Sequence, residues 1–267
     1  MGAGQSHFCA HTVLMSDERP QEPIAWHLLE QQGITRRVLK TLLSQRPKKH
    51  AVFFMLLLVL PCMFLSVLSW QNPAIYEAFA VSGEALLNGK QWYRLMTSLF
   101  LHGDPGHLIS NTYMLIALSI FIFGQLIESV KGGFLLMFFL LLGGGLVNYL
   151  TVGSYPPEIR LIGISGLVYL AAGFWFINYL LIDRRRTFKA RFLRTAGVAL
   201  IILFPTTFEA TTSYLAHFHG FWLGLVMGGV FFYLNKTAIR SHEVVKLEFP
   251  EEEVIELVPE TAPDTFH

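Results

Sequence analysis

Three short clusters of polar side chains interrupt long apolar stretches of this chain, and together they hold the residue types that acyl transfer uses. His107 and Asn111 are four residues apart, so a helix would place both side chains on one face. Ser165 is closely flanked by glycines, which let a substrate or another backbone approach its hydroxyl. His217 lies three residues before a ladder of glycines at positions 220, 224 and 228. A serine nucleophile, a histidine base and two hydrogen-bond donors are the parts needed to attack a carbonyl and to hold the resulting oxyanion.

Each cluster, taken alone, also fits a purely structural role. The His107–Asn111 pair fits a polar clamp between helices, and Ser165 fits a close contact between helices. His217 alone fits a hydrogen-bonded residue near the end of a helix. The chemical interpretation is stronger only if the three clusters meet, so the elements that carry them decide the question.

Long charge-free stretches predict that these elements are membrane-spanning helices. The chain has 267 residues, of which 53% are hydrophobic and 15% charged, whereas soluble domains carry about 25% charged residues. This composition excludes an ordinary cytosolic protein, a disordered chain and a nucleic-acid binder. A span needs about 20 apolar residues, and the alternation typical of a membrane barrel is absent. We predict an all-α polytopic membrane protein with a sixth helix over 193–209 and five clear spans, at 50–76, 105–127, 132–157, 161–182 and 210–235.

The distribution of Lys and Arg predicts which side each connection faces. With the N-terminus in the cytoplasm, fifteen of these residues fall in inner segments and three in outer ones, which is the bias expected of membrane proteins. We predict a cytoplasmic N-terminal segment (1–50), a membrane domain (51–235) and an acidic cytoplasmic tail (236–267). Residues 24–46 have the pattern of a short amphipathic helix, and the tail is expected to be mostly solvated.

This topology places the three clusters at one depth, about 10 Å below the outer surface at 1.5 Å per residue. Ser165 is expected about five residues into its helix. His217 would take the proton from Ser165, while His107, Asn111 and the Ser165 amide would hold the oxyanion. No acidic residue lies in this layer, so we expect a Ser–His dyad whose imidazole stacks on Tyr169. The longest outer connection, about 71–106, mixes apolar and polar residues and is expected to lie in the membrane interface.

Four motifs, in this order, resemble those of the rhomboid intramembrane serine proteases, and the resemblance covers roughly residues 51–235. The run Trp92-Tyr93-Arg94-x-x-Thr97-x-x-Phe100-x-His102 is similar to the family's first loop, and His107-x-x-x-Asn111 is similar to its second helix. Gly163-Ile164-Ser165-Gly166 is similar to the GxSG nucleophile motif, and Ala216-His217-x-x-Gly220-x-x-x-Gly224 to the AHxxGxxxG base motif. The family usually has Trp and Arg adjacent, whereas Tyr93 separates them here.

The resemblance implies a six-transmembrane-helix rhomboid-like bundle with a long membrane-embedded loop between helices 1 and 2. It also assigns roles. Ser165 matches the nucleophile and His217 the base, His107 and Asn111 match the oxyanion donors, and Tyr169 matches the aromatic residue that packs on the base. Glu128 resembles a residue that ties down a cytoplasmic turn, and His219 matches no catalytic position. Structural roles are implied for Trp92, Arg94, His102, Glu128, Gly163, Gly166, Gly220 and Gly224.

The implied reaction is hydrolysis of a peptide bond in or near the outer end of a substrate transmembrane helix. The expected partners are transmembrane-helix protein substrates and the lipid bilayer, with no nucleic acid, no cofactor and no metal, and the oligomeric state is not indicated. Substrates are expected to reach the site between the helix over 193–209 and helix 2. The bare six-helix core looks like a bacterial inner-membrane form whose active site opens to the outer, periplasmic side.

Three other functions compete with proteolysis. A catalytically silent rhomboid-like protein would bind transmembrane clients without cleaving them. A small transporter would show internal repeats and polar residues through the bilayer midplane, and few such residues are visible. A haem or metal protein would need His102, His107, His217 and His219 as ligand pairs at mid-depth, and their spacing does not favour such pairs.

Overall fold

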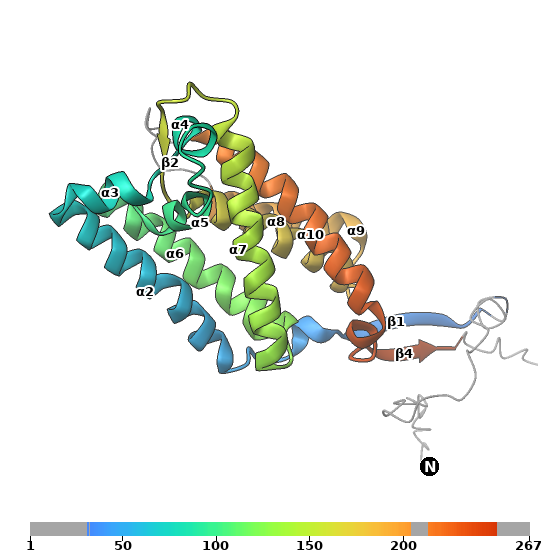
Figure 1. Ribbon diagram of the computed structural model, residues 1–267. Coiled ribbons are helices and arrows are strands. Elements are labelled where there is room, and N and C mark those ends of the chain that lie inside the picture. Colours follow the sequence, from blue (N-terminus) through green and yellow to red (C-terminus); the bar gives the residue numbers. More distant parts are fainter. Residues whose placement is uncertain (1–30, 32, 204–212, 250–267) are drawn as a thin grey trace, which may run out of the picture. The chain divides into compact units, whose positions relative to one another are not determined.

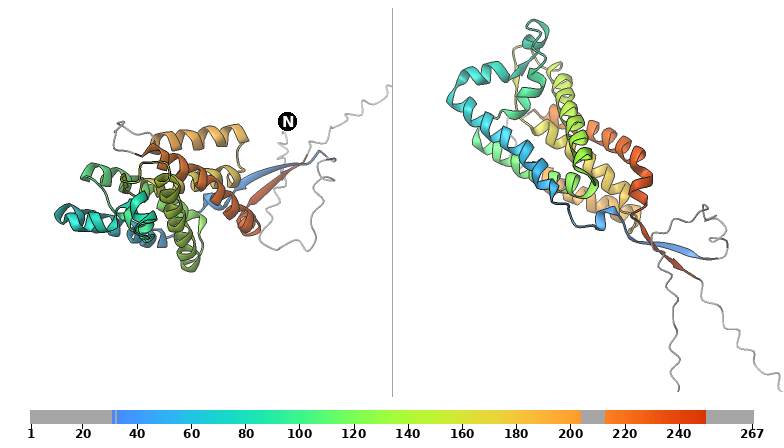
Figure 2. Two further views of the ribbon diagram at one scale, coloured as in Figure 1. Left: turned by 45° about the horizontal axis from the view of Figure 1, so that its top comes forward. Right: turned by 60° about the horizontal axis from the view of Figure 1, so that its bottom comes forward.

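The computed structural model describes residues 31, 33–203 and 213–249, and it divides the chain into two compact units. The smaller unit is built from the two ends of the chain, where strands β1 (Thr35–Lys40) and β4 (Val244–Glu248) form a two-stranded sheet. The larger unit, residues 40–243, holds the helices. Figures 1 and 2 show these helices as a bundle.

The small sheet corrects two expectations for the chain ends. The helix expected over 24–46 is wrong in its described part, because Thr35–Lys40 is a strand and Leu42–Ser44 (η1) is a single 3-10 turn. The expected solvated tail is wrong for Val244–Glu248, which pairs with β1. Opposite charges join the two strands, as Arg37 lies 3.9 Å from Glu248. A strand pairing between distant parts of the chain leaves no periodic signal in either part alone.

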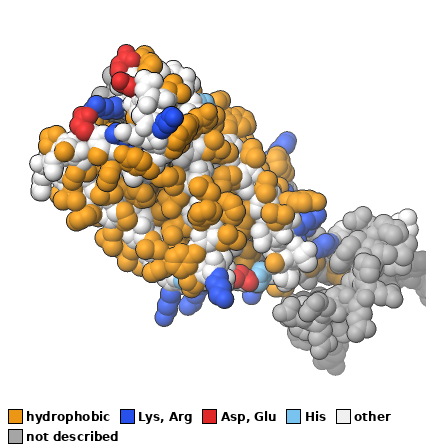
Figure 3. All heavy atoms as spheres, in the orientation of Figure 1, with side chains coloured by type: hydrophobic (Ala, Val, Ile, Leu, Met, Phe, Trp, Pro, Cys, Tyr) orange, Lys and Arg blue, Asp and Glu red, His pale blue; other side chains and the backbone are white. Residues whose placement is uncertain are grey.

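Five helices of the larger unit are long and apolar enough to cross a membrane. Figure 3 shows the matching surface, with an apolar band over the bundle and charged side chains gathered at its two ends. The chain is therefore an integral membrane protein. The five spans are α2 (His50–Gln71), α6 (Pro105–Phe121) with its π-helical extension η3 (Ile122–Leu126), α7 (Val130–Val152), α8 (Ser165–Ile182) and α10 (Tyr214–Arg240).

The sixth predicted span corresponds in part to α9 (Phe188–Leu203). This helix has 16 residues and begins five residues earlier than predicted. The rest of the predicted span, 204–209, lies outside the described residues. The count of six membrane helices stays a prediction.

Helices α8 and α10 are in backbone contact along a stripe of glycines. A Cβ added at Gly220 would lie 2.3 Å from the carbonyl oxygen of Gly166, and one at Gly224 would lie 2.0 Å from that of Leu170. A Cβ at Gly173, on the facing helix, would lie 2.1 Å from the carbonyl of Phe221. Only residues without a side chain allow this approach, so the two helices have a fixed register.

The connection between α2 and α6 folds into short elements that contact the ends of the spans. These are α3 (Pro73–Phe79), β2 (Val81–Ser82), α4 (Gly83–Leu87), α5 (Arg94–Thr97) and η2 (Ser98–Phe100). The guanidinium of Arg94 donates to the carbonyls of Glu77 and Ala80 at the end of α3. Asn148 of α7 donates to the Leu95 carbonyl and to the Ser98 hydroxyl, at 3.0 Å each. The connection is thus anchored to α7.

Candidate active site

Ser165 is the first residue of α8. The expectation that it lies about five residues inside the helix is wrong. Residues 160 and 161 form strand β3, which pairs antiparallel with β2. The absence of charge after Arg160 predicted a membrane segment correctly but could not show that its first residues are extended rather than helical.

Gly163 brings the chain from β3 into the start of α8. Its φ is +108°, a conformation that side chains strongly disfavour. Its amide donates to the carbonyl of Ser98 at 3.0 Å, and a Cβ at this position would lie 3.1 Å from the His107 ring. Residue 163 must therefore be glycine on two grounds, backbone conformation and space. The loop before α6 holds the segment that positions Ser165.

The helix start has an electrostatic consequence for Ser165. The first amides of an α-helix have no acceptor within the helix, and the helix dipole places partial positive charge there. The amides of Ser165 and Gly166 are in this position in α8. Such a helix start favours a developing negative charge.

His217 lies in the first turn of α10, which Ser213 caps by accepting from the amide of Ala216. The imidazole stacks on the Tyr169 ring, with 4.0 Å between ring centroids and 7° between planes. Tyr214 contacts the same imidazole edge-on, at 5.8 Å and 83°. Nε2 of His217 is buried and has no hydrogen-bond partner among the described residues.

The glycine stripe places the helix turns that carry Ser165 and His217 next to each other. Gly166 follows Ser165. A Cβ added at Gly166 would lie 3.8 Å from the Cβ of Ala216, the residue that precedes His217. The two polar residues therefore lie in the first turns of helices whose backbones touch. The phenol of Tyr169 donates to the carbonyl of Leu203 at 2.9 Å. This bond holds in place the ring on which the His217 imidazole stacks.

His107 and Asn111 come from the start of α6, where Asp104 caps the helix by accepting from the His107 amide at 2.9 Å. His107 borders Gly163 and is close enough to His217 for an electrostatic interaction. Asn111 is 3% exposed, and its side-chain nitrogen has no hydrogen-bond partner among the described residues. A buried amide donor without a partner is costly, so this nitrogen is a candidate donor to a bound group.

The ring of His102 packs against the ring of His107. The two rings meet edge-on with 5.2 Å between centroids. Nδ1 of His102 lies 2.9 Å from the Ser66 hydroxyl, and its carbonyl accepts from the Trp70 indole at 2.7 Å. Burial, and secondarily the neighbouring His107, lowers the pKa of His102 to about 3. The ring is therefore neutral at physiological pH and acts as a fixed contact rather than as a charge.

Three predicted residues lie away from this group. Trp92 is half exposed, with its ring 6.2 Å from that of Tyr149. Arg94 caps α3, as described above. Glu128 lies at the opposite end of the bundle, 2.6 Å from His242 and 3.8 Å from Lys48.

Sequence reasoning missed the residues that support the site. Ser66 and Trp70 lie one helical turn apart in α2 and both bond to His102. Their four-residue spacing was a usable signal, although serine within an apolar helix is common. Tyr214 and Asn148 were missed in the same way, because a single polar residue near a helix end has many explanations.

Comparisons with known proteins identify the family to which the chain belongs. A family model described as the rhomboid domain matches residues 89–234, more than half of the chain. The chain is also 30% identical over 138 residues to rhomboid-like protein 11, chloroplastic, of Arabidopsis thaliana. That match covers 47% of this chain and 42% of the plant protein, so the chain spans less than half the length of this relative.

Proposed function

This chain belongs to the rhomboid family of membrane proteins, and we propose that it is an active serine endopeptidase that cleaves transmembrane substrates. The observation that carries the proposal is the placement of Ser165 and His217. They lie in the first turns of two helices in backbone contact, and the imidazole is held flat against Tyr169 with a buried Nε2 that has no hydrogen-bond partner among the described residues. That nitrogen is the atom a general base would offer to the serine.

The proposed reaction has two halves. In the first, Oγ of Ser165 attacks the scissile carbonyl while Nε2 of His217 takes the hydroxyl proton. The tetrahedral intermediate collapses, the C–N bond breaks, and His217 gives the proton to the leaving amine. In the second half, water gives a proton to His217 and attacks the acyl-enzyme, which releases the acid and restores the Ser165 hydroxyl.

The oxyanion would be held by donors from two helix starts. The Ser165 amide comes from α8, and the side chains of His107 and Asn111 come from α6. Donors of this kind act by being oriented before the charge develops, and losing one costs about 10²–10³ in rate. The positive ends of α6, α8 and α10 all lie at this layer and favour the same charge.

We propose that Tyr169 takes over the orienting role that a carboxylate has in a catalytic triad. Stacking restricts the tilt of the imidazole, and the bond from Tyr169 to Leu203 restricts the stacking ring. The edge contact with Tyr214 restricts rotation in the plane. A Ser–His dyad with a sterically oriented base is therefore the proposed machinery.

The proposed substrates are proteins with a transmembrane helix whose end near the site is easily unwound. A helical peptide bond is shielded by its own hydrogen bonds, so local unwinding must precede attack. From the distribution of Lys and Arg we infer that the site opens to the outer side and that the termini are cytoplasmic. A bacterial inner membrane remains the sequence-based proposal for the host membrane, alongside the chloroplast that the relative's name indicates for that protein.

The test is cleavage of a single-span substrate by the purified protein in liposomes. Wild type should cleave and should label with a fluorophosphonate, and Ser165→Ala and His217→Ala should do neither. His219→Gln is the matched control, because His219 lies two residues from His217 and bonds to Thr151 instead. Cleavage that survives Ser165→Ala would refute the mechanism. Wild type that neither cleaves nor labels would favour a silent client-binding protein.

A further inference from the structure

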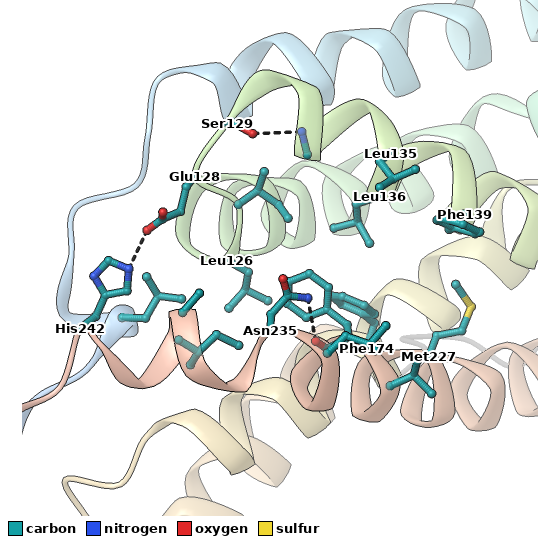
Figure 4. Close-up of a pocket in the computed structure, with 18 of the residues that line it drawn as sticks. Leu126, Glu128, Ser129, Leu135, Leu136, Phe139, Phe174, Met227, Asn235 and His242 are labelled. Atoms are coloured by element: carbon teal, nitrogen blue, oxygen red, sulfur yellow. Dashed lines mark hydrogen bonds and ion pairs between the residues drawn. The ribbon is translucent and has the colours of Figure 1, made fainter. Parts of the chain in front are cut away.

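A hollow lies at the end of the bundle away from Ser165. It is a cavity of about 550 Å³ between the first half of α7 and the second half of α10. Pockets that hold small molecules have volumes of about 300–1,000 Å³. Figure 4 shows its two ends, with Glu128 and His242 at one and Phe139, Met227 and Phe174 at the other.

The cavity exists because α7 and α10 touch at one level and separate below it. At Gly143 of α7, an added Cβ would lie 3.1 Å from the sulfur of Met227 on α10. Closer to the distal end, bulky side chains of both helices, including Phe139 and Leu234, line the cavity.

The walls of the cavity are apolar and open to the surroundings. Leu135 is 59% exposed, Val230 53% and Leu234 74%. These residues belong to membrane spans, so the medium that reaches them is lipid rather than water. On α10 the apolar lining runs from Val226 to Leu234, which is about 12 Å at 1.5 Å per residue. One leaflet of the hydrocarbon core is about 15 Å deep, so an acyl chain fits this depth.

Most polar residues of the cavity lie at its distal mouth. Glu128, Ser129 and His242 line this end, whereas Asn235 lies midway along the α10 side and donates to the Phe231 carbonyl. Lys48 lies 3.8 Å from the Glu128 carboxylate, and the carboxylate is more than half exposed. The mouth thus presents the Glu128 carboxylate with His242 2.6 Å away and Lys48 just outside the lining, at the level where a phospholipid carries its headgroup.

We propose that this cavity binds one phospholipid with a primary-amine headgroup, from the leaflet opposite the candidate active site. One acyl chain lies between α7 and α10. The phosphate meets Lys48, and the ammonium group donates to Glu128. This pairing distinguishes a primary amine from a choline headgroup, because choline has no N–H to donate.

The first test is retention of added lipid by the delipidated full-length protein, measured by native mass spectrometry. The probes are phosphatidylethanolamine, phosphatidylcholine and phosphatidylglycerol with identical acyl chains. Wild type should retain the ethanolamine lipid about five- to tenfold better than the choline lipid, the scale of one charge-assisted hydrogen bond. Glu128→Gln should remove this preference. Equal retention of all three lipids by wild type, or a preference for the glycerol lipid, would overturn the proposal.

The second test locates the lipid. An ethanolamine lipid with a photoreactive acyl chain should crosslink to peptides from 130–139 and 226–239. Filling the cavity with Val230→Phe and Ala238→Phe together should abolish these crosslinks. Leu146→Phe is the control, because Leu146 is exposed on α7 outside the cavity. If the filled variant does not fold, crosslink positions in wild type and Glu128→Gln still decide. Crosslinks spread evenly over the bundle, or unchanged in a folded filled variant, would refute the site.

Discussion

The imidazole of His217 is oriented by ring contacts, since the described residues around it include no carboxylate partner. Tyr169 covers one face and Tyr214 meets an edge. A stacked ring fixes tilt but supplies no charge to stabilise an imidazolium. At the residue scale, the candidate base therefore depends on the shape of its neighbours, and aromatic substitutions separate shape from hydrogen bonding.

Tyr169→Ala should lower kcat by at least about tenfold, a part of the 10²–10⁴-fold that a positioned base contributes. Tyr169→Phe should lose less, because the stacked ring remains and only the bond to Leu203 is removed. The measurement is kcat and KM for both variants with one substrate. If Phe and Ala lose the same activity, the hydroxyl rather than the stacking is what matters.

His102 should make the folded protein sensitive to acid. Its pKa in the folded state, about 3, lies below the ordinary value of 6.5, so the folded protein binds fewer protons than the unfolded chain between these values. The stability that the neutral ring contributes is present above pH 6.5 and is lost as the pH falls towards 3.

The thermal unfolding midpoint should therefore fall as wild type is acidified through this window. His102→Gln, which cannot titrate, should show a smaller fall, even though its midpoint at neutral pH is lower. Parallel curves for wild type and His102→Gln would show that other groups cause the acid sensitivity.

Individual candidate residues could be singled out from the sequence because polar side chains are rare in membrane helices. Ser165, His217, His107 and Asn111 stood out in apolar stretches for this reason, and the structure places His107 against Gly163 and Tyr169 against His217. The supporting bonds of Ser66 and Trp70 were not predictable, since they depend on a distant loop folding back onto α2.

At the scale of elements, the contact between α8 and α10 sets the relation between Ser165 and His217. The sequence predicted the glycine stripe on α10 but not its partner surface on α8. The start of α8 was also misplaced, because the absence of charge does not distinguish extended chain from helix. The pairing of β2 with β3 and the positive φ of Gly163 fix that start, and both depend on the preceding loop.

Two glycines of α10 allow a matched test of this contact. Gly224→Ala would place a Cβ 2.0 Å from the Leu170 carbonyl, so it should force the helices apart, cost about 1–3 kcal/mol of stability and lower activity. Gly229→Ala meets no atom within 4 Å and should be neutral or stabilising by up to about 1 kcal/mol. The measurement is the unfolding midpoint together with substrate cleavage. Equal effects of the two substitutions would mean that helix propensity, not packing, governs this helix.

For the whole molecule, hydropathy predicted the class correctly, since five described helices are long and apolar enough to span a membrane. The sequence could not predict the cavity between α7 and α10, because it depends on how the two helices pack against each other along their length. The sequence also could not decide whether the chain crosses the membrane between α8 and α10, because the apolar stretch there is shorter and has a charged residue at each end.

The accessibility of engineered cysteines tests whether the chain crosses the membrane between α8 and α10. We expect Thr187→Cys to react with a membrane-impermeant reagent from the side of the termini, and Ser213→Cys from the side of the candidate site. Both are made in a Cys9→Ser background, because Cys62 is buried. Lys131→Cys is the control for the side of the termini. Labelling of both positions from one side would contradict a membrane crossing by α9.

The two ends of the membrane unit meet. Nε2 of Gln45 lies 3.1 Å from Nδ1 of His242, so the chain enters and leaves this unit at the same surface. A path that departs from one face of a bilayer and returns to that face crosses it an even number of times. The five described spans make an odd count. Parity therefore predicts one more passage, and the interval between Ile182 and Tyr214, which contains α9, is where we expect it.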